Sequence, residues 1–288
     1  MSISSMVCLR LCDTVSMWHA RARRRDRQMS DILKRQDAGG IATLTLDDDA
    51  TLNSLSDAML ADLGDQLSDI SGSDLKAVVI RAEGRAFCAG HNLRQMQDMR
   101  QAEDGGAAAF ADLFDRCTAV MTAIRDLPQP VIAEVHSLAT AAGCQLVAAC
   151  DMAVASGNAR FGVNGVNIGL FCSTPMVALS RNLGRKRAFE MLSTGRFLTA
   201  SEAEAAGLVN RVVDPEQLRD TTRELAETVA GKLSAAVRIG KGAFYAQAEL
   251  GLDDAYALTR DAMVANLGEP DTAEGMAAFL EKRKPNWT

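Results

Sequence analysis

The groups of this sequence best placed to do chemistry are backbone N–H groups at two expected helix starts. The first lies in residues 130–151, PVIAEVHSLATAAGCQLVAACD, which begin as a β-branched, strand-like run and continue as a helix. Between the two, residues 139–143 are all small, and the first turn of a helix leaves its N–H groups unpaired. A ligand could therefore approach this backbone closely. Small residues could equally serve only to pack the helix tightly on a sheet, and this stretch alone leaves both interpretations open.

A second helix start lies in residues 83–93, EGRAFCAGHNL. Its glycines indicate a loop, which leads from a buried strand expected at 77–81 into a helix. The start of that helix presents another set of free N–H groups. The sequence therefore holds two helix starts at which the backbone could bind a ligand.

Both stretches belong to an α/β pattern, because short strand-like runs alternate with amphipathic helical ones from residue 41 onwards. Residues 164–175 lack a helical period and suit a loop that lines a pocket. Gly184, Gly195 and Gly207 are each expected to end a helix, the last after a start at 199–202 that resembles a capping box displaced by one residue. The expected strands are 41–46, 77–81, 131–135, 152–155, 159–161 and 209–213. The expected helices include 57–70, 107–126, 234–248, 252–267 and 271–282.

Charge divides the chain into an extension and a body. The chain carries a net charge of −6, but residues 1–30 hold six arginines against two aspartates, so they are +4 and leave −10 for the remainder. This stretch is predicted to be a disordered basic extension, an organelle-targeting peptide, or the product of a gene start placed upstream of a true first residue, Met29. We expect a bacterial protein to be cytoplasmic, and a protein with a targeting peptide to reach the mitochondrial matrix. The acidic body argues against a nucleic-acid partner.

Composition indicates a soluble globular protein, since 48% of the 288 residues are hydrophobic and no apolar run is long enough to span a membrane. No secretory signal is apparent. The seven cysteines show no CxxC spacing and are predicted to be reduced thiols of an intracellular protein. With three histidines and no Cys/His cluster, we expect no metal site. The body is predicted to comprise a core over 31–230 and a helical region over 231–288.

Four motifs in order are similar to the crotonase, or enoyl-CoA hydratase/isomerase, superfamily. They are RAFCAGHNL (85–93), AAGCQLVAACD (141–151), TGRFLTASEAEAAGLVNRVV (194–213) and AFLEKRKPNW (278–287). Together they cover the body from about residue 41 onwards, and they look most like a mitochondrial branch with bacterial relatives. The resemblance implies an α/β fold, the crotonase-like ββα spiral, with a helical C-terminal trimerisation region and assembly into homotrimers or homohexamers. It also implies an acyl-CoA thioester as substrate, so that coenzyme A enters as part of the substrate and no separate cofactor is expected.

The resemblance also assigns site residues. It makes the backbone N–H groups of His91 and Ala142 the two donors of an oxyanion hole, which gives a role to both helix starts. Phe279 and Lys282 would close the adenine end of coenzyme A, with a neighbouring subunit as one possible source. The residues implied to line the coenzyme A path are Leu55, Ala89, His91, Asn92, Leu93 and Arg94, next to Ala142.

The chain departs from the family pattern at the catalytic positions. Hydratases of the superfamily use two glutamates to handle water, and this sequence has Gln145 and Gly165 in their places. An amide cannot act as a carboxylate base and glycine has no side chain, so the acid–base pair for hydration is missing. Ala142 stands where glycine is usual in the family. Its N–H is kept, but the added methyl group narrows the path by which a ligand can reach that N–H. We expect a poor hydratase, and partial recovery when glutamate is placed at both positions.

Few residues could replace the missing pair. His91 could be a base, although a role through its N–H needs no side chain, and His136 is a weaker candidate. Asn167 could orient a water or a carboxylate. Thr140 and Gln145 are the polar groups expected nearest the thioester, or else they serve only in capping and core hydrogen bonds. Asn164, Cys172 and Ser173 could line the acyl pocket, whereas Cys144 and Cys150 are predicted core thiols.

Three function classes follow. The first, which we favour, is an enzyme of acyl-CoA or fatty acid metabolism, a lyase or isomerase related to enoyl-CoA hydratase. The second is a decarboxylase of a malonyl-type CoA ester, because the AGH sequence at 89–91 is similar to that branch and loss of carbon dioxide needs an oxyanion hole but no base at the two altered positions. The third is an acyl-CoA binder without catalysis.

Overall fold

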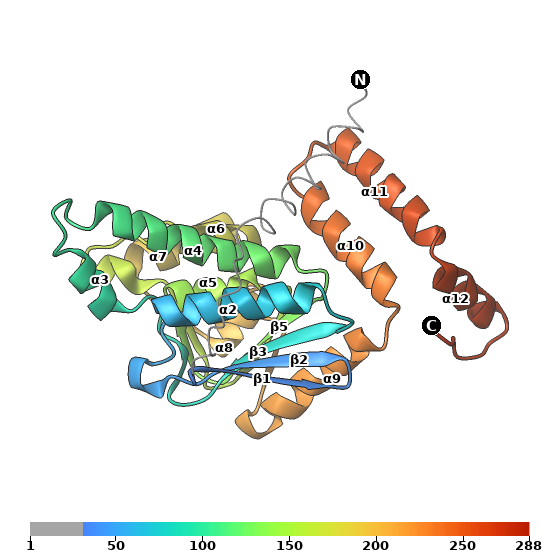
Figure 1. The fold of residues 1–288 in the computed structure, drawn as a ribbon, viewed down its shortest axis with the longest axis horizontal. Coiled ribbons are helices and arrows are strands. Elements are labelled where there is room, and N and C mark those ends of the chain that lie inside the picture. Colours follow the sequence, from blue (N-terminus) through green and yellow to red (C-terminus); the bar gives the residue numbers. More distant parts are fainter. Residues whose placement is uncertain (1–30, 288) are drawn as a thin grey trace. The chain divides into compact units, whose positions relative to one another are not determined.

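Parallel strands rich in β-branched residues and alanine form the centre of the fold, and nearly all of their side chains are buried. The computed structural model describes residues 31–287, so the predictions for the extension 1–30 and for Cys8 and Cys12 lie outside it. The main sheet has six strands in the order β1-β2-β3-β5-β7-β10 (Figure 1). They are β1 (Leu33–Ala38), β2 (Ile41–Leu46), β3 (Ala77–Ala82), β5 (Val131–Val135), β7 (Met152–Ser156) and β10 (Arg211–Val213).

A second, four-stranded sheet has the order β4-β6-β8-β9. Each of its first three strands follows a strand of the main sheet along the chain, β3 to β4, β5 to β6 and β7 to β8, and a helix comes next. This winding is the ββα spiral, and the predicted fold class is confirmed. The strands are β4 (Ala86–Cys88), β6 (Leu138–Thr140), β8 (Arg160–Gly162) and β9 (Leu198–Thr199).

Helices cover both faces of the main sheet, as a buried parallel sheet requires. The principal core lies under α2 (Asp57–Ser71), α4 (Ala107–Asp126) and α5 (Ala142–Ala149), and α9 (Leu218–Ala230) covers the opposite face (Figure 1). Glu134 of β5 is buried on the α9 side, where burial raises its pKa.

The remaining helices pack on the core helices, on the second sheet or at the C-terminal end of the chain. α3 (Leu93–Met99) packs on α4, α6 (Pro175–Asn182) lies between α5 and α7 (Arg185–Thr194), and α8 (Ala200–Ala205) packs on β8 and β9. Short 3-10 helices are η1 (Asp49–Thr51), η2 (Asn164–Ile168) and η3 (Pro215–Gln217). The chain ends in α10 (Ser234–Gln247), α11 (Leu252–Leu267) and α12 (Pro270–Leu280). No helix between residues 31 and 287 has the length and hydrophobicity that a membrane crossing needs.

Most expected elements match the structure, and the exceptions have local causes. Residues 164–175 include the 3-10 helix η2 as well as a loop. Gly184 follows the C-cap of α6, as expected, and it is also the N-cap of α7. The capping box of α8 is regular, because the Thr199 side chain accepts from Glu202 N while Glu202 accepts from Thr199 N. The last strand begins only at residue 211. At residue 210 the Asn210 side chain, and not its backbone, accepts the hydrogen bond from Ala153 N at 2.8 Å.

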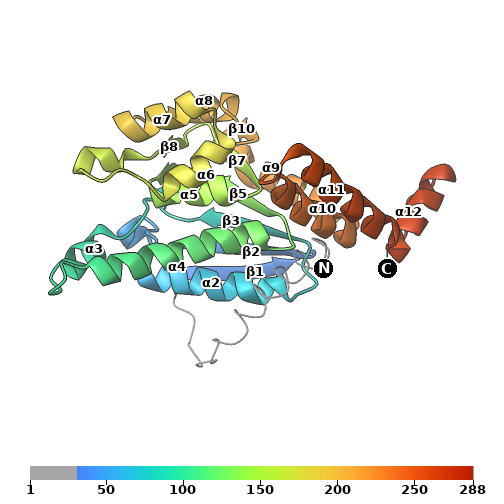
Figure 2. The same cartoon turned by 90° about the horizontal axis from the view of Figure 1, so that it is seen from above.

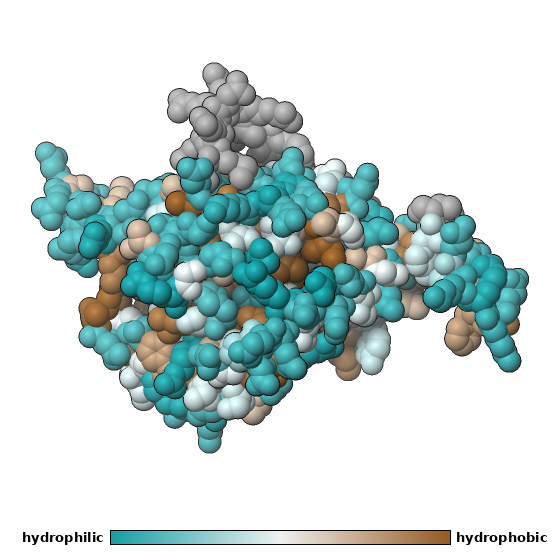
Figure 3. Space-filling model, turned by 90° about the horizontal axis from the view of Figure 1, so that it is seen from below, coloured by the Kyte–Doolittle hydropathy of each residue, from teal (hydrophilic) through white to brown (hydrophobic). Residues whose placement is uncertain are grey.

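The three C-terminal helices lie beyond the end of the main sheet, away from α3 (Figures 1 and 2). In these helices only Ala278 is buried, and the face in Figure 3 shows hydrophobic side chains among polar ones there. Large hydrophobic side chains therefore remain exposed in the single chain, among them Phe244, Leu252, Tyr256, Met263, Val264, Leu267, Met276, Phe279 and Leu280.

One buried ion pair anchors α10 to the sheet. Lys241 Nζ donates to Asp151 Oδ2 at 2.7 Å and to the carbonyls of Ile124 and Gln129, both at 3.0 Å. The Tyr245 hydroxyl donates to the other Asp151 oxygen at 2.8 Å. The Lys241 and Asp151 side chains are 7% and 13% exposed, so solvent screens this pair little. All three donors of the Lys241 ammonium have an acceptor, and burial is the main influence, lowering its pKa.

Replacing Lys241 should release α10. Lys241→Met keeps the apolar stem but leaves the Asp151 carboxylate without its cation, so we expect the free energy of unfolding to fall by about 3–5 kcal/mol. Urea unfolding gives this value, and limited proteolysis should cut first within residues 231–287. Arg238→Met on the same helix is the control, because Arg238 is exposed and contacts Glu269 only at 3.8 Å. Equal effects of the two changes would contradict the anchoring role.

Candidate functional site

The two predicted helix starts lie against each other in the structure. A Cβ on Gly90 would lie 3.2 Å from Ala142 N and 2.9 Å from Ala141 Cβ. A Cβ on Gly143 would lie 2.1 Å from the carbonyl oxygen of Cys88, which is a severe clash. The first turn of α5 can therefore pack on the end of β4 only because both positions are glycine.

The N–H groups at these two starts are free. Leu55 N donates to Gly90 O at 2.8 Å and forms a short parallel bridge with His91. Within residues 31–287, neither the His91 N–H nor the Ala142 N–H has a hydrogen-bond acceptor. The geometry thus brings together two unpaired donors, of which one opens the loop before α3 and the other opens α5.

Ala141 is held in a strained conformation just before the second donor. Its φ of +50° and ψ of −121° lie outside the regions open to most residues with a side chain, and such backbone costs about 1–3 kcal/mol. The Ala141 N–H donates to Gly162 O at 2.9 Å, which helps to hold this turn in place. The turn makes Ala142 the first residue of α5, with its N–H unpaired. No pattern in the sequence around Ala141 indicates this strain.

The His91 side chain points into the protein, where it packs edge-to-face on Phe114 of α4 with ring centroids 5.6 Å apart. Both ring nitrogens are buried without a hydrogen-bond partner among the described residues. Burial lowers the pKa of His91, and the positive charge of Arg116 lowers it further. Both influences favour the neutral form of the imidazole.

Three polar side chains come from elements next to Ala142: one from the end of β6, one from α5 and one from the start of η2. Gln145 is 5% exposed, and its Oε1 is buried without a hydrogen-bond partner. The Thr140 hydroxyl donates to Asn164 Oδ1 at 2.6 Å, which ties β6 to the start of η2. Thr140 and Asn164 are thus brought together, and the Gln145 amide is left with an unused acceptor.

The η2 loop is folded so tightly at Gly165 that no side chain fits there. A Cβ on Gly165 would lie 2.5 Å from Leu170 O and 2.8 Å from Cys172 Sγ. Leu170 N also donates to Gly165 O at 2.9 Å, so a hydrogen bond holds the backbone of residue 170 against that of residue 165. This corrects the expectation that glutamates at 145 and 165 would partly restore hydration, because a side chain at 165 must first displace the loop.

Asn167 lies against the C-terminal end of α7. Its Oδ1 lies 2.7 Å from where a Cβ of Gly195 would be, and the residue is exposed. Its amide therefore packs against the end of α7, whereas Asn164 is the asparagine that reaches Thr140. The role of Asn167 in orienting a water or carboxylate stays a prediction.

The residues of the predicted coenzyme A path include the neighbours of His91 in the sequence and Leu55, which pairs with it in a short bridge. Leu55 is fully buried, Ala89 is half-buried, and Leu93 and Arg94 are exposed. The Asn92 side chain caps α3 by accepting from the N–H groups of the first turn. Leu93 and Arg94 are thus the exposed members of this set.

Phe279 and Lys282 are not brought to this site within one chain. They lie at the end of α12, on the opposite side of the molecule from α3 in both views (Figures 1 and 2). Phe279 is 83% exposed. If these residues close the adenine end of coenzyme A, a neighbouring subunit must supply them.

The other candidates have structural surroundings. His136 Nε2 pairs with the Gly84 carbonyl at 2.9 Å. Cys144 and Cys150 are buried core thiols, and burial raises the pKa of Cys144 to about 12. Ser173 donates to the Phe171 carbonyl at 3.3 Å. The five cysteines between residues 31 and 287 are free and buried, and no group of three or more potential metal ligands occurs in that range.

We compared the chain with known protein families, sequences and structures, and they identify a family that agrees with this fold. The sequence model of the Enoyl-CoA hydratase/isomerase family matches residues 36–288, and the chain belongs to this family. It is 46% identical over 250 residues to human Enoyl-CoA hydratase domain-containing protein 3, mitochondrial, covering 86% of this chain and 81% of that protein. It is 34% identical over 256 residues to a putative enoyl-CoA hydratase of Thermus thermophilus, covering 86% and 98%.

Solved structures agree with this assignment. An enoyl-CoA hydratase of Mycobacterium smegmatis superposes with a TM-score of 0.86 at 49% identity, covering 90% of this chain and 99% of that one. The human enoyl Coenzyme A hydratase domain-containing protein 3 superposes with a TM-score of 0.84 at 45% identity, covering 89% and 100%. The predicted resemblance to a mitochondrial branch with bacterial relatives is confirmed.

The closed contact at Gly165 gives a prediction about activity. We expect the double change Gln145→Glu with Gly165→Glu to raise crotonyl-CoA hydration less than about tenfold, although general acid–base groups in place contribute about 10²–10⁴ each. The reason is that the second carboxylate cannot be placed without moving residues 165–172. Steady-state hydration assays of the starting protein, the two single variants and the double variant measure this. Hydration by the double variant at ordinary hydratase rates would contradict the steric argument.

The close contact at Gly165 also gives a prediction about stability. Gly165→Ala should lower the free energy of unfolding by about 1–3 kcal/mol, because the methyl group overlaps the Leu170 carbonyl. Gly64→Ala in α2 is the matched change, since a Cβ there meets no atom within 4 Å. It should leave stability unchanged or raise it by up to about 1 kcal/mol. Thermal or urea unfolding of both variants separates the steric effect from the general effect of removing a glycine.

Proposed function

We propose that this protein binds an acyl-CoA thioester and stabilises its enolate between the backbone N–H groups of His91 and Ala142. The observation that carries the proposal is that these two donors are unpaired at adjoining helix starts. A thioester carbonyl oxygen placed between them would accept both hydrogen bonds. The acyl chain would then extend toward Gln145 and the η2 loop.

The chemistry that this arrangement favours is the build-up of negative charge on the thioester oxygen. Fixed donors that meet such charge contribute about 2.7–4 kcal/mol each in comparable sites. Because Ala142 begins α5, the helix dipole adds to the effect. These donors belong to the backbone, so they serve any reaction that passes through a thioester enolate, including isomerisation and carbon–carbon cleavage.

Ordinary hydration is the reaction that the site supports least. It needs a carboxylate to take a proton from water and a second group to order that water. Gln145 is a neutral amide, Gly165 has no room for a side chain, and the buried His91 ring has a lowered pKa and points toward Phe114. We therefore infer a hydratase-related enzyme in which the enolate, and not the activated water, is the stabilised species.

Decarboxylation of a malonyl-type CoA ester is the second candidate. In that reaction the bond between the α-carbon and the carboxylate breaks, its electron pair enters the thioester enolate, carbon dioxide leaves, and the α-carbon later takes a proton from water. No base is required. The observation in its favour is that the polar groups nearest the donors, Thr140, Asn164 and Gln145, are all uncharged, so nothing there repels a substrate carboxylate. Acyl-CoA binding without catalysis is the third candidate.

The enolate site makes a prediction about ligand stabilisation. A non-hydrolysable thioester analogue should raise the melting temperature more than free coenzyme A at equal concentration, because only the analogue has a carbonyl for the two donors. Ala142→Pro removes one N–H and should abolish the difference, while Ala142→Gly keeps the N–H and should preserve it. Differential scanning fluorimetry measures the shifts, with circular dichroism to check the fold. Equal shifts with both ligands would exclude the enolate site.

Proline at 142 follows the strained Ala141, so the variant could fail to fold. A semisynthetic protein with lactate in place of Ala142 removes the same N–H without adding bulk, and it tests the same point. Assays with crotonyl-, longer enoyl-, methylmalonyl- and ethylmalonyl-CoA then decide between the candidates. Turnover of the malonyl esters alone selects decarboxylation, and turnover of none selects binding without catalysis.

We also propose that the protein is a homotrimer or homohexamer. The support is the exposed apolar surface of α10–α12, where Phe244, Tyr256 and Phe279 are 64%, 71% and 83% exposed. A neighbouring subunit would cover this surface and bring Phe279 and Lys282 to the acyl-CoA site. The compartment remains a prediction that rests on residues 1–30, since the relatives include proteins named as mitochondrial and others from bacteria.

Light scattering at micromolar concentration should therefore give a mass of three or six chains. Exchanging the exposed Met263 and Leu267 for glutamate should shift the population toward monomers, because charges would be buried at the subunit contact. The same exchange at exposed Ile168 and Val177, in η2 and α6, serves as the comparison. A monomeric starting protein would contradict the assembly.

A further inference from the structure

Two side-chain amides lie next to the Ala142 donor, and the proposed enolate stabilisation uses neither of them. The first belongs to Gln145, whose backbone N–H donates to Ala141 O at 3.1 Å in the first turn of α5. Side chains on a helix lean toward its N-terminus and cover the residues three and four positions earlier. The Gln145 side chain therefore lies over the turn formed by Ala141 and Ala142, beside the place proposed for the thioester carbonyl.

The Gln145 amide is almost entirely enclosed, yet it makes no hydrogen bond. The residue is 5% exposed, and its Oε1 is buried without a donor among the described residues. Its Nε2 has no acceptor within residues 31–287 either, but unlike Oε1 it keeps contact with solvent. The amide thus turns its oxygen into the core and leaves its two N–H donors where a bound molecule can reach them.

The second amide is that of Asn164 at the start of η2. The Thr140 hydroxyl donates to its Oδ1 at 2.6 Å, which fixes the amide with its oxygen toward β6. The Nδ2 group has no acceptor in the described part of the chain and is not enclosed. Because Thr140 lies two residues before Ala142, this hydrogen bond holds the free Asn164 donors next to the same helix start.

The elements that carry these donors contain no charged side chain. The sequences of β4, β6, α5 and η2 are AFC, LAT, AGCQLVAA and NGVNI. The groups that they offer to a bound acyl chain are therefore backbone N–H groups and neutral amides. An amide donor that is shielded from water and left unpaired is unfavourable, so both amides favour a ligand with an oxygen acceptor.

We propose that Gln145 and Asn164 select acyl-CoA thioesters with a second carbonyl-type oxygen on the β-carbon, as in a 3-oxoacyl or a malonyl-type ester. The inference rests on the proposed function, because it places the first carbonyl oxygen between the N–H groups of His91 and Ala142. The second oxygen would accept from Gln145 Nε2 and Asn164 Nδ2. Both residues determine specificity, and neither exchanges a proton with the substrate.

A substrate of this class also suits a site without a carboxylate base. The α-hydrogens of a 3-oxoacyl thioester are already acidic, and a malonyl-type ester reaches its enolate by losing carbon dioxide. In both cases the site must hold two oxygens and stabilise the charge that develops on the first.

Binding of amide analogues of acyl-CoA tests this selection with the full-length protein. In these compounds N–H replaces the thioester sulfur, so the carbonyl is kept and the acyl group resists turnover. The 3-oxobutyryl and malonyl analogues carry the second oxygen acceptor, the butyryl analogue has none, and the 3-hydroxybutyryl analogue has a hydroxyl group there. By isothermal titration calorimetry we expect at least one of the first two to bind about tenfold more tightly than the butyryl analogue. The tighter of the two tells a 3-oxoacyl ligand from a malonyl-type one.

The butyryl analogue and free coenzyme A separate this proposal from the enolate site. If the butyryl analogue binds more tightly than coenzyme A but as tightly as the 3-oxobutyryl and malonyl analogues, the selection fails and the enolate site stands. If no analogue binds more tightly than coenzyme A, both proposals fail. Tightest binding of the 3-hydroxybutyryl analogue would also overturn the selection, because its hydroxyl group would then donate to an amide oxygen.

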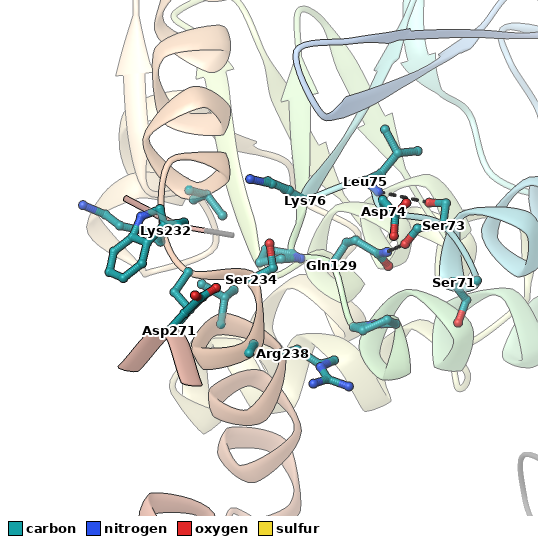
Figure 4. A pocket seen from close by; sticks show the side chains of 18 residues that line it. Ser71, Ser73, Asp74, Leu75, Lys76, Gln129, Lys232, Ser234, Arg238 and Asp271 are labelled. Carbon is teal, nitrogen blue, oxygen red and sulfur yellow. Dashed lines mark hydrogen bonds between the residues drawn. The ribbon is translucent and has the colours of Figure 1, made fainter. Parts of the chain in front are cut away.

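Variants assign the preference to the two amides. Gln145→Met removes the amide at similar volume, and Asn164→Asp keeps the acceptor for Thr140 but replaces the amino group by an oxygen. Each should reduce the preference over the butyryl analogue at least threefold. Lys232→Gln is the control for a general effect of charge and should retain the preference, because Lys232 lines a cavity at the amino ends of β3 and β5 (Figure 4). A preference that persists in both amide variants would overturn the proposal.

Stability separates a role in selection from a role in the core. The Gln145 amide pairs with nothing among the described residues, so Gln145→Met should melt at the same temperature as the starting protein or higher, while it loses the preference. A lower melting temperature with the preference retained would make Gln145 a structural residue and overturn the proposal. Differential scanning fluorimetry without ligand gives this comparison.

Discussion

The contact between the first turn of α5 and the end of β4 is the constraint on which the proposed acyl-CoA site depends. Gly90 and Gly143 have no Cβ, so the Ala142 N–H comes within reach of the loop that carries the His91 N–H. Any side chain at either glycine would push the two helix starts apart, and the two donors would no longer face one oxygen. The strained turn at Ala141 belongs to the same arrangement, because the close packing holds a backbone conformation that alanine would otherwise avoid.

Sequence reasoning predicted the regular elements well, because they depend on local patterns. The residues 107–126, 131–135 and 252–267 show the periods of a helix, a strand and a helix, and the structure has these elements with the same bounds. It missed β1, a largely exposed edge strand whose polar residues LKRQDA carry no strand pattern, and the three-residue β6, which is too short to have one. Gly184 follows the end of α6 as predicted, but its second position as the N-cap of α7 was not predicted.

The candidate site was predictable only where backbone groups and motifs define it. Glycines and small residues indicate the helix starts within 83–93 and 139–143, and the family resemblance assigns His91 and Ala142 as their donors. The pairing of Thr140 with Asn164 joins residues 24 apart and needs the fold. The space at Gly165 is a similar case. The sequence indicates that a carboxylate is absent there, but only the positions of Leu170 and Cys172 reveal that a side chain cannot be added. The glycine at 165 and the tight η2 loop are thus one feature, since the loop occupies the space that a side chain would need.

The segment that carries the second donor also holds the C-terminal helices. Asp151 ends the run that begins with Ala142, and its carboxylate accepts from Val131 N at 2.6 Å as well as from Lys241 and Tyr245 of α10. The start of β5, the end of α5 and the middle of α10 therefore meet at one side chain. If a neighbouring subunit supplies Phe279 and Lys282 to the acyl-CoA site, then each subunit sets the direction of those residues through its own Asp151. The ion pair would in that case position the far end of the substrate site of another chain, although it lies outside the site of its own.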